Sequence, residues 1–364
     1  MTTMVATANN ADLAAAIKRL LPLAKTTSTM PILESFKIVS NGSVLAITAS
    51  DLTSWLTVTV QSEKCEAFEC AVSAALFSKA IAAFDDDAAC QLQYDEQSHK
   101  LTLKSKRSRF SFVTLPARDF PTEQVDEQDI VMSGTWEAKK FAVALDRVYH
   151  AMAKRDVRFY LNGALFHARD KVSFVATDGH RMAIERTTLA NDVGGEVQLI
   201  VDRDAVHSLR ALANGCVGDL RVSSDGRKFV AEGIDFAFST KLIDGQFPNY
   251  ERAISKKQEA FNVQRKDFLS ALRSVACATN KLRGMRIDAA QDKVVVSAKN
   301  AEDATAEVSV PAEVLENTSA TFNVDYLIDC FESVDQENVL VLYGSSQLEV
   351  TSDSSTRVVM QLRD

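Results

Sequence analysis

Apolar residues recur at helical spacing in three segments of the chain. Each segment has an apolar-x-x-Ala-apolar core that continues one turn later, which is the stripe of an amphipathic helix. The segments lie about 128 residues apart, and we therefore expect one such helix in each third of the chain. The stripes are formed by Leu13, Ala16, Ile17 and Leu20, by Phe141, Ala144, Leu145 and Val148, and by Phe268, Ala271, Leu272 and Val275.

A second helix is expected later in each third. Val72-Ser73, Val201-Asp202 and Val324-Asp325 each place a strand-like Val before a plausible N-cap residue. An apolar stripe follows each pair. The stripes are Leu76, Ala80 and Phe84, then Val206, Leu209 and Ala213, then Leu327, Ile328 and Phe331.

Between the two helices of each third the apolar positions alternate on a period of two. The segments FKIVSNGSVLAITASD, ALFHARDKVSFVATDG and MRIDAAQDKVVVSAKN therefore predict strand-turn-strand units. Two helices and a hairpin recurring in the same order favour three repeats over a two-domain chain. Each repeat is expected to be α+β, with two helices packed on antiparallel sheet. Apolar periodicity lapses at 121–129 and 251–260, which predicts domains at 1–126, 127–255 and 256–364.

Composition supports a globular protein. The chain has 364 residues, of which 46% are hydrophobic and 25% charged, and the net charge of −8 argues against a broad basic surface. The six cysteines show no C-x-x-C spacing, so we expect reduced, mostly buried thiols. The start of the chain lacks the basic and apolar regions of a signal peptide, and a cytoplasmic location is expected.

One short motif invites a catalytic interpretation. Asp178 and His180, on either side of Gly179, could form an acid/base pair, which makes a hydrolase one hypothesis. No nucleophile or metal ligands accompany them at a suitable spacing, so a surface turn at the end of a strand is the simpler interpretation. A third interpretation makes this turn one wall of a peptide-docking pocket. No glycine-rich phosphate loop is present, and a non-enzyme is favoured.

Basic residues recur in one register of the first helix of each repeat. Lys18 and Arg19, Arg147, and Arg273 follow the shared helix core, and further basic residues come just after these helices. This repetition favours a local positive surface that contacts phosphates without sequence preference. The DNA-facing candidates are Lys18, Arg19, Lys25, Arg147, Lys154, Arg155, Arg158, Tyr160, Arg203, Arg273, Lys281 and Arg283.

The sequence resembles a known family. RDVRFYLNGALFHARDKVSFVATDGHRMAIERTTL is similar to the middle domain of the bacterial DNA polymerase III beta subunit, the replicative sliding clamp. TMPILESFKIVSNGSVLAITASDLTSWLTV, TLPARDFP, KLIDGQFPNYERAI and RVVMQLRD match other parts of it, so the resemblance covers essentially the whole chain. It implies a head-to-tail homodimeric ring of three similar domains per subunit around duplex DNA. Such a ring holds DNA by topology, which is compatible with the negative net charge.

The resemblance also implies one peptide-docking pocket per subunit, between the second and third domains. Its partners would be the polymerase catalytic subunit, the clamp loader and other proteins that carry a clamp-binding peptide. No cofactor, metal or membrane partner is implied. The residues that match the pocket are Leu161, Thr177, Gly179, His180, Arg181, Met182, Pro248, Arg252, Ala253, Asn323, Tyr326, Ser346, Val358, Met360, Leu362 and Arg363.

Two other classes of function remain as alternatives. One is an acidic, repeat-built interaction scaffold that does not encircle DNA. The other is the hydrolase centred on Asp178 and His180. The repeated basic register distinguishes a clamp from the scaffold, and the lack of a nucleophile weakens the hydrolase.

Overall fold

The predicted three-fold repeat of α+β domains is confirmed. The computed structural model describes residues 3–24, 27–122, 129–169, 171–187, 190–193, 195–254, 257–300, 304–344 and 346–362, and each third has two helices among antiparallel strands. The N-terminal domain contains β1 (Thr3–Asn9), α1 (Asn10–Leu20), β2 (Ser35–Asn41), β3 (Val44–Ser50), β4 (Ser54–Gln61), β5 (Lys64–Cys65), β6 (Phe68–Ser73), α2 (Ala74–Ala82), β7 (Ala89–Asp95), β8 (Lys100–Ser105) and β9 (Ser108–Val113).

The next two domains repeat this order. The central domain contains β10 (Met132–Glu137), α3 (Ala138–Tyr149), β11 (Gly163–Ala168), β12 (Val172–Thr177), β13 (Arg181–Thr187), β14 (Ala190–Val193), β15 (Val197–Asp202), α4 (Arg203–Gly215), β16 (Asp219–Ser224), β17 (Lys228–Glu232) and β18 (Phe236–Lys241). The C-terminal domain contains β19 (Gln258–Gln264), α5 (Arg265–Val275), β20 (Gly284–Ala290), β21 (Lys293–Lys299), β22 (Thr305–Val314), β23 (Thr318–Asn323), α6 (Val324–Glu332), β24 (Asn338–Gly344), β25 (Gln347–Thr351) and β26 (Ser355–Met360).

The chain forms two compact units. Unit 1 consists of residues 1–138 and 212–241, and unit 2 consists of residues 139–211 and 242–364. In unit 1 the strands pair in the orders β5-β1-β7-β8-β9 and β10-β16-β17-β18-β4-β3-β2-β6. In unit 2 the order is β15-β11-β12-β13-β26-β25-β24-β19-β22-β21-β20-β23. Both units therefore contain a sheet that runs from one domain into the next.

These continuous sheets join at equivalent strand pairs. β18 of the central domain pairs antiparallel with β4 of the N-terminal domain. β26 of the C-terminal domain pairs antiparallel with β13 of the central domain. In each joint the last strand of one domain therefore meets the third strand after the first helix of the preceding domain.

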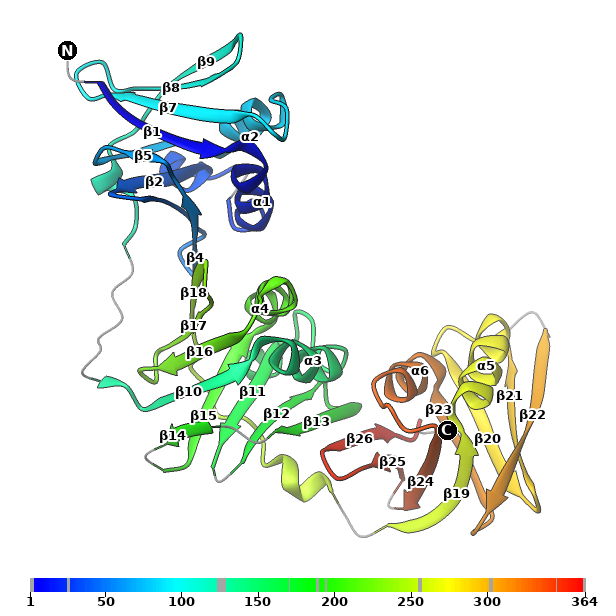
Figure 1. Ribbon diagram of the computed structural model, residues 1–364. Helices are drawn as coiled ribbons and strands as arrows, with labels where there is room; N and C mark the ends of the chain where they lie inside the picture. The colour runs from blue at the N-terminus through cyan, green and yellow to red at the C-terminus, as the bar shows by residue number, and fades with distance from the viewer. Residues whose placement is uncertain are drawn as a thin grey trace. The chain divides into compact units, whose positions relative to one another are not determined.

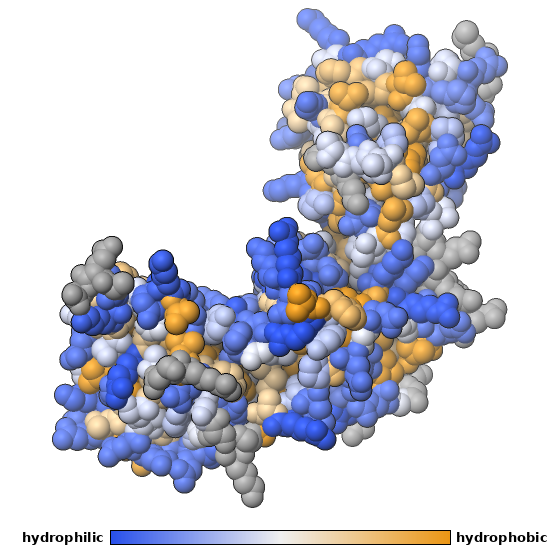
Figure 2. Space-filling model, turned by 180° about the vertical axis from the view of Figure 1, so that it is seen from behind, coloured by the Kyte–Doolittle hydropathy of each residue, from blue (hydrophilic) through white to orange (hydrophobic). Residues whose placement is uncertain are grey.

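Helices cover one face of each sheet, and the core lies between them. In unit 1, α1 packs against α2, and Phe36 meets Phe77 edge-on with ring centroids 6.4 Å apart. In unit 2, α5 packs against α6 (Figure 1). The ring centroids of Phe268 and Phe331 lie 4.8 Å apart. On the face that Figure 2 shows, hydrophilic side chains predominate and apolar side chains gather in patches. All six cysteines are free, and four are buried, as expected.

The helices begin close to where the sequence predicts them, with one correction. Ser73 caps α2, and the Asp202 carboxylate accepts a hydrogen bond from the backbone N–H of Asp204 at 2.8 Å. In the third repeat the N-cap is Asn323 and not Asp325. The Asn323 side chain accepts hydrogen bonds from two backbone N–H groups of the first turn, while Asp325 lies inside the helix and pairs with Arg283. None of the described helices is long and apolar enough to cross a membrane.

Candidate peptide-docking and DNA-facing sites

The turn between β12 and β13 is fixed by its own side chains. The Thr177 hydroxyl donates to the Arg181 carbonyl at 2.7 Å and accepts from the Gly179 N–H at 3.1 Å. Gly179 has a φ of +90°, and a Cβ there would lie 2.8 Å from an Arg158 guanidinium nitrogen. Only glycine therefore fits this position without a shift of its neighbours.

The geometry of the same turn does not support catalysis by Asp178 and His180. One oxygen of the Asp178 carboxylate accepts from the backbone N–H groups of His180 and Arg181 at 2.9 and 3.0 Å, and the other from the Arg181 guanidinium at 3.1 Å. The carboxylate thus holds the turn and does not orient the imidazole of His180. Among the described residues, no group of three or more His, Cys, Asp or Glu side chains could hold a metal ion.

An apolar floor lies on unit 2 beside this turn. Leu161, Met182 and Val358, which the resemblance assigns to the pocket, are at most 5% exposed and belong to one apolar cluster. Met182 and Val358 are direct partners across the joint of β13 with β26. We call this cluster the apolar floor; its other members include Leu165, Val175, Ile184, Phe247 and Tyr250.

Sequence reasoning missed those other members for identifiable reasons. Leu165 and Val175 lie on strands in which most residues are buried, so the alternation does not tell which face each side chain takes. Phe247 lies in a loop, where no periodicity exists. The usable signal was its place in the Gln-Phe-Pro-Asn-Tyr stretch quoted for the resemblance.

Arg181 forms the polar edge of the floor toward the C-terminal domain. Its guanidinium lies over the Tyr326 ring, 4.3 Å from the centroid, and forms an ion pair with Asp329 of α6. Asn323 caps α6 one turn away and donates from its side chain to the Leu282 carbonyl at 3.2 Å. The structure therefore brings Thr177, Arg181 and Tyr326 together, as the resemblance implies.

Gln361 and Leu362, which follow β26, are no longer in strand geometry. The N–H of Met360 donates to His180 O, that of Gln361 to Ser346 O, and that of Leu362 to Thr321 O, at 2.8, 2.9 and 2.8 Å. The Gln361 side chain accepts from the Tyr343 hydroxyl at 2.7 Å. Met360 is 38% exposed. Leu362 is half-buried beside Gly284.

The segment 248–253 forms another edge of the floor. Pro248, Arg252 and Ala253 are exposed, and the Ala253 carbonyl accepts from the Gln347 side chain at 2.7 Å, next to exposed Ser346. Tyr250 anchors the segment, because its hydroxyl lies 2.9 Å from Nδ1 of buried His167. Of the sixteen assigned residues, Arg363 lies outside the described residues.

Several of the DNA-facing candidates are paired with acidic groups. Arg19 pairs with Asp235 at 2.6 Å, Arg273 with Glu332 at 2.6 Å, and Arg283 with Asp325 at 2.7 Å. Arg158 hydrogen-bonds to Asp156 and lowers the pKa of that carboxyl to about 2. Arg203 stacks on Tyr149, and Tyr160 packs against the apolar floor. These pairings offset much of the positive charge that the sequence pattern predicts.

A smaller set of cations remains exposed. Lys18, Lys154, Arg155 and Lys281 are exposed and have no ion-pair partner among the described residues. Each lies in or just after the first helix of its repeat, on α1 or after α3 and α5. Lys25 lies outside the described residues. The exposed set is the best candidate for loose contact with phosphates.

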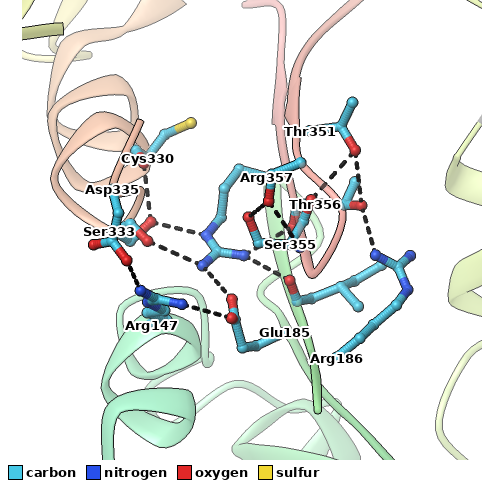
Figure 3. Close-up of polar contacts among 12 residues, drawn as sticks. Arg147, Glu185, Arg186, Cys330, Ser333, Asp335, Thr351, Ser355, Thr356 and Arg357 are labelled. Atoms are coloured by element: carbon cyan, nitrogen blue, oxygen red, sulfur yellow. Dashed lines mark hydrogen bonds and ion pairs between the residues drawn. The ribbon is translucent and has the colours of Figure 1, made fainter. Parts of the chain in front are cut away.

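The joint between the central and C-terminal domains buries a charged cluster (Figure 3). Arg357 of β26 is 1% exposed and donates to the Glu185 carboxylate at 3.0 Å and to the Ser333 hydroxyl at 2.8 Å. Glu185 also accepts from Arg147 at 2.7 Å, and Arg147 pairs with Asp335. Burial lowers the pKa of Arg357, and the adjacent Glu185 opposes that shift. The cluster therefore fixes the joint that carries the apolar floor.

Comparisons with known proteins agree with the repeat. Models of the N-terminal, central and C-terminal domains of the DNA polymerase III beta subunit match residues 4–124, 135–249 and 252–363. The chain is 33% identical to a beta sliding clamp of Pseudomonas putida over 92% of this chain and 93% of the relative. It is also similar to the structure of a DnaN sliding clamp from Pseudomonas aeruginosa bound to griselimycin, with a TM-score of 0.94, 29% identity and full coverage of both chains.

Proposed function

Because the chain belongs to the family of DNA polymerase III beta subunits, the DNA sliding clamps, we propose that two copies close head-to-tail around duplex DNA and present one peptide-docking floor each. Members of this family are processivity factors and not catalytic enzymes. A scaffold without a DNA role is not favoured, since the relatives are sliding clamps.

The main support for the ring is a pair of strand edges that neither of the two domain joints uses. The last strand of a domain pairs with the third strand after the first helix of the domain before it, in both joints. β9 is the last strand of the N-terminal domain, and β22 is the third strand after the first helix of the C-terminal domain. Among the described strands, neither β9 nor residues 305–309 of β22 pairs with a strand of another domain, and β9 neighbours only β8. Pairing β9 of one subunit with β22 of the next supplies the missing joint and closes a two-fold ring of six domains.

The register of this subunit joint follows from the other two. In one joint the last strand begins at Phe236, which lies opposite Val58. In the other joint it begins at Ser355, which lies opposite Glu185. Ser108 and Val308 hold the corresponding places in β9 and β22. Continuing the register puts exposed Arg109 opposite exposed Glu307, an attractive cross-strand pair.

This register predicts a charge-reversal effect on the dimer. Arg109→Glu replaces an attractive pair by a repulsive one at both joints of the ring. We expect the dimer dissociation constant to rise about 5- to 30-fold, or roughly 1–2 kcal/mol for the two contacts together. Sedimentation velocity over a dilution series measures it. Adding Glu307→Arg should restore the dimer, and a double variant as weak as Arg109→Glu alone would contradict the register.

We assign to the pocket the apolar floor and the edges described above. The floor suits two large apolar side chains of a peptide, and Arg181 with the backbone of the β12–β13 turn suits its polar groups. The partners would be the polymerase catalytic subunit, the clamp loader and other replication proteins that carry such a peptide. The exposed cations Lys18, Lys154, Arg155 and Lys281 would contact phosphates loosely, and the ring would work in the cytoplasm without a cofactor.

Removing the apolar anchors tests the pocket. Met360→Ala and Leu362→Ala should each cost roughly 1–3 kcal/mol of binding, or about 5- to 100-fold in affinity. Titration of a labelled peptide with a Gln followed by two large apolar residues measures it by fluorescence anisotropy. Leu315→Ala, a comparable exposed leucine in the same domain, is the matched control. Unchanged affinity in the Met360→Ala/Leu362→Ala double variant would place the peptide elsewhere.

Alternation along a terminal strand puts the Gln361 side chain on the opposite side from those of Met360 and Leu362, so alternation alone predicts that Gln361→Pro changes peptide affinity little. The contacts of Gln361 predict a larger effect. Proline would remove the N–H that donates to Ser346 O and the side-chain acceptor of the Tyr343 hydroxyl. Gln361 therefore supports the edge of the floor and is unsuitable as a control.

A further inference from the structure

The end of β11 carries two side chains that hold the short helical turn η5 (Tyr250–Ala253). Nδ1 of His167 lies 2.9 Å from the Tyr250 hydroxyl, and the Arg169 guanidinium donates to the Glu251 carboxylate at 2.9 Å. Arg169 also donates to the His167 ring at 2.9 Å, so both side chains lie on the same side of the strand end. Two consecutive residues of η5 are therefore attached to β11.

The two attachments differ in burial. His167 is 2% and Tyr250 is 9% exposed, and their rings meet edge-on with the centroids 5.8 Å apart. The side chains of Arg169 and Glu251 are 41% and 55% exposed. Because an exposed ion pair contributes little stability, the buried contact of His167 with Tyr250 is the main attachment of η5.

This buried contact is compatible with either tautomer of the His167 ring. Burial raises the pKa of Tyr250, so the hydroxyl keeps its proton at neutral pH. A hydroxyl can donate or accept a hydrogen bond, and it therefore bonds to Nδ1 whether or not that nitrogen carries a hydrogen. The other ring nitrogen, Nε2, lies 2.7 Å from the Glu196 carboxylate, which fixes the orientation of the ring.

Tyr250 connects the end of β11 with the docking floor. It belongs to the same apolar cluster as Leu161 and Phe247. Arg252 and Ala253, which the resemblance assigns to the pocket, follow in the same helical turn. The position of Tyr250 therefore sets the position of this edge, although His167 itself is too deeply buried to contact a peptide.

In unit 1 a valine holds the place of His167. Val39 and His167 are each the fifth residue of their strand, β2 and β11. Val39 pairs with Ala46 of the next strand, as His167 pairs with Ser173. The valine side chain forms no hydrogen bonds, so the repeat folds without a polar attachment at this position. This difference favours a role of His167 in the docking site over a general role in the fold.

We propose that His167 is a positioning residue of the peptide-docking site, which acts through the Tyr250 hydroxyl and holds the edge at Arg252 and Ala253 in place for the peptide. The inference rests on the proposed function, because it takes the apolar floor as the place where the peptide docks. An edge that has lost this attachment must be ordered again when the peptide binds, and this cost lowers the affinity.

A double-mutant cycle on the intact protein tests the proposal. His167→Phe and Tyr250→Phe each remove one partner of the hydrogen bond. We expect each to weaken binding of the labelled peptide with a Gln followed by two large apolar residues about 3- to 10-fold, measured by fluorescence anisotropy. The double variant should bind no more weakly than His167→Phe alone, because both changes remove the same bond. Losses that multiply in the double variant would overturn the proposal.

Tyr94→Phe is the matched control for the cycle. Tyr94 is a buried tyrosine of unit 1, 6% exposed, and lies on β7. Its loss of a hydroxyl should leave the affinity for the peptide unchanged. A loss equal to that of Tyr250→Phe would mean that removal of any buried hydroxyl weakens binding, and it would contradict a role of His167 in positioning.

His167→Asn separates positioning from stability. The Asn amide reaches the place of Nδ1 and can bond to the Tyr250 hydroxyl, but it leaves a cavity where the rest of the ring was. We therefore expect His167→Asn to bind the peptide more tightly than His167→Phe, although it melts at a lower temperature. Affinities that follow the melting temperatures would mean that His167 only stabilises the fold, and the proposal would be wrong.

Trypsin cleavage after Arg252 reports the order of the edge directly. Under native conditions and without peptide, cleavage should be about threefold faster or more in His167→Phe and Tyr250→Phe than in wild type and Tyr94→Phe. Mass spectrometry identifies the cleaved bond and measures the rate. Equal rates in all four proteins would show that the edge does not depend on this hydrogen bond.

The same titrations separate this inference from the proposed function. If Met360→Ala/Leu362→Ala loses the peptide while His167→Phe binds it as wild type does, only the role of His167 is wrong. If His167→Phe weakens the peptide while Met360→Ala/Leu362→Ala does not, His167 positions the site and the assignment of Met360 and Leu362 is wrong. A wild-type protein that does not bind the peptide would overturn both.

Discussion

Loaded on a closed circular duplex, the protein should stay bound in salt that removes ordinary phosphate-binding proteins, and it should leave when the circle is cut. The exposed cations Lys18, Lys154, Arg155 and Lys281 give eight contacts in a dimer at most. A protein held by about eight phosphates alone loses roughly 10⁴-fold in affinity between 50 and 200 mM salt. The retention of a closed ring on circular DNA does not depend on salt in this way, because release requires a subunit joint to open.

Gel filtration of the complex before and after restriction cleavage of the same plasmid measures this. We expect the protein to be retained on the circle at 200 mM salt. After cleavage we expect it to be lost within the time that the ring needs to slide to a DNA end. Lys154→Gln with Arg155→Gln should leave retention on circles unchanged, while Arg109→Glu should shorten it by weakening the subunit joint. Equal half-lives on circular and linear DNA would contradict encirclement.

Breaking the buried charged cluster by a single substitution should cause a large loss of stability. Glu185→Leu leaves the guanidinium of Arg357, which is 1% exposed, without its carboxylate partner. Removing one member of a buried ion pair costs about 3–5 kcal/mol, because the remaining charge stays desolvated. For a unit of this size that corresponds to a fall in Tm of roughly 6–20 °C.

A double-mutant cycle separates the uncompensated charge from lost packing. Arg357→Met with Glu185→Leu should unfold at a higher temperature than Glu185→Leu alone, because no lone buried charge remains. Arg273→Met is the matched control, since its pair with Glu332 is about half-exposed and worth at most about 1 kcal/mol. Scanning calorimetry measures wild type, Glu185→Leu, Arg357→Met, the double variant and the control. If Glu185→Leu has the same melting temperature as the control, the cluster does not hold the joint.

The repeated helices and hairpins could be predicted because their signals are local. The stripe at Leu13, Ala16, Ile17 and Leu20 needs only the period of one helix, and all four residues are buried in α1 as expected. The cap of α6 was misplaced by two residues because Asn323 and Asp325 are both good N-caps, and the choice depends on Arg283, 42 residues earlier.

The docking site was predictable only in part. Leu161, Met182 and Val358 came from the resemblance, and alternation alone does not bring them together, because they lie on η4 (Phe159–Leu161), β13 and β26. Leu165 and Val175 were missed because both faces of their strands are covered. The pairing of Trp55 with Ser239 across the other joint was not visible in the sequence, because the two residues are 184 positions apart.

The sequence by itself determined the three repeats, the helices and the family, because these depend on residues within a few turns of one another or on motifs that can be read in order. Only the tertiary structure decided which charges are neutralised and which edges remain open. Arg357 and Glu185 are 172 residues apart in the chain, and nothing local indicates that this arginine is buried while Lys154 stays exposed. The role of a charged residue depends on the partners that folding brings close to it, and those partners lie on other strands and in other domains.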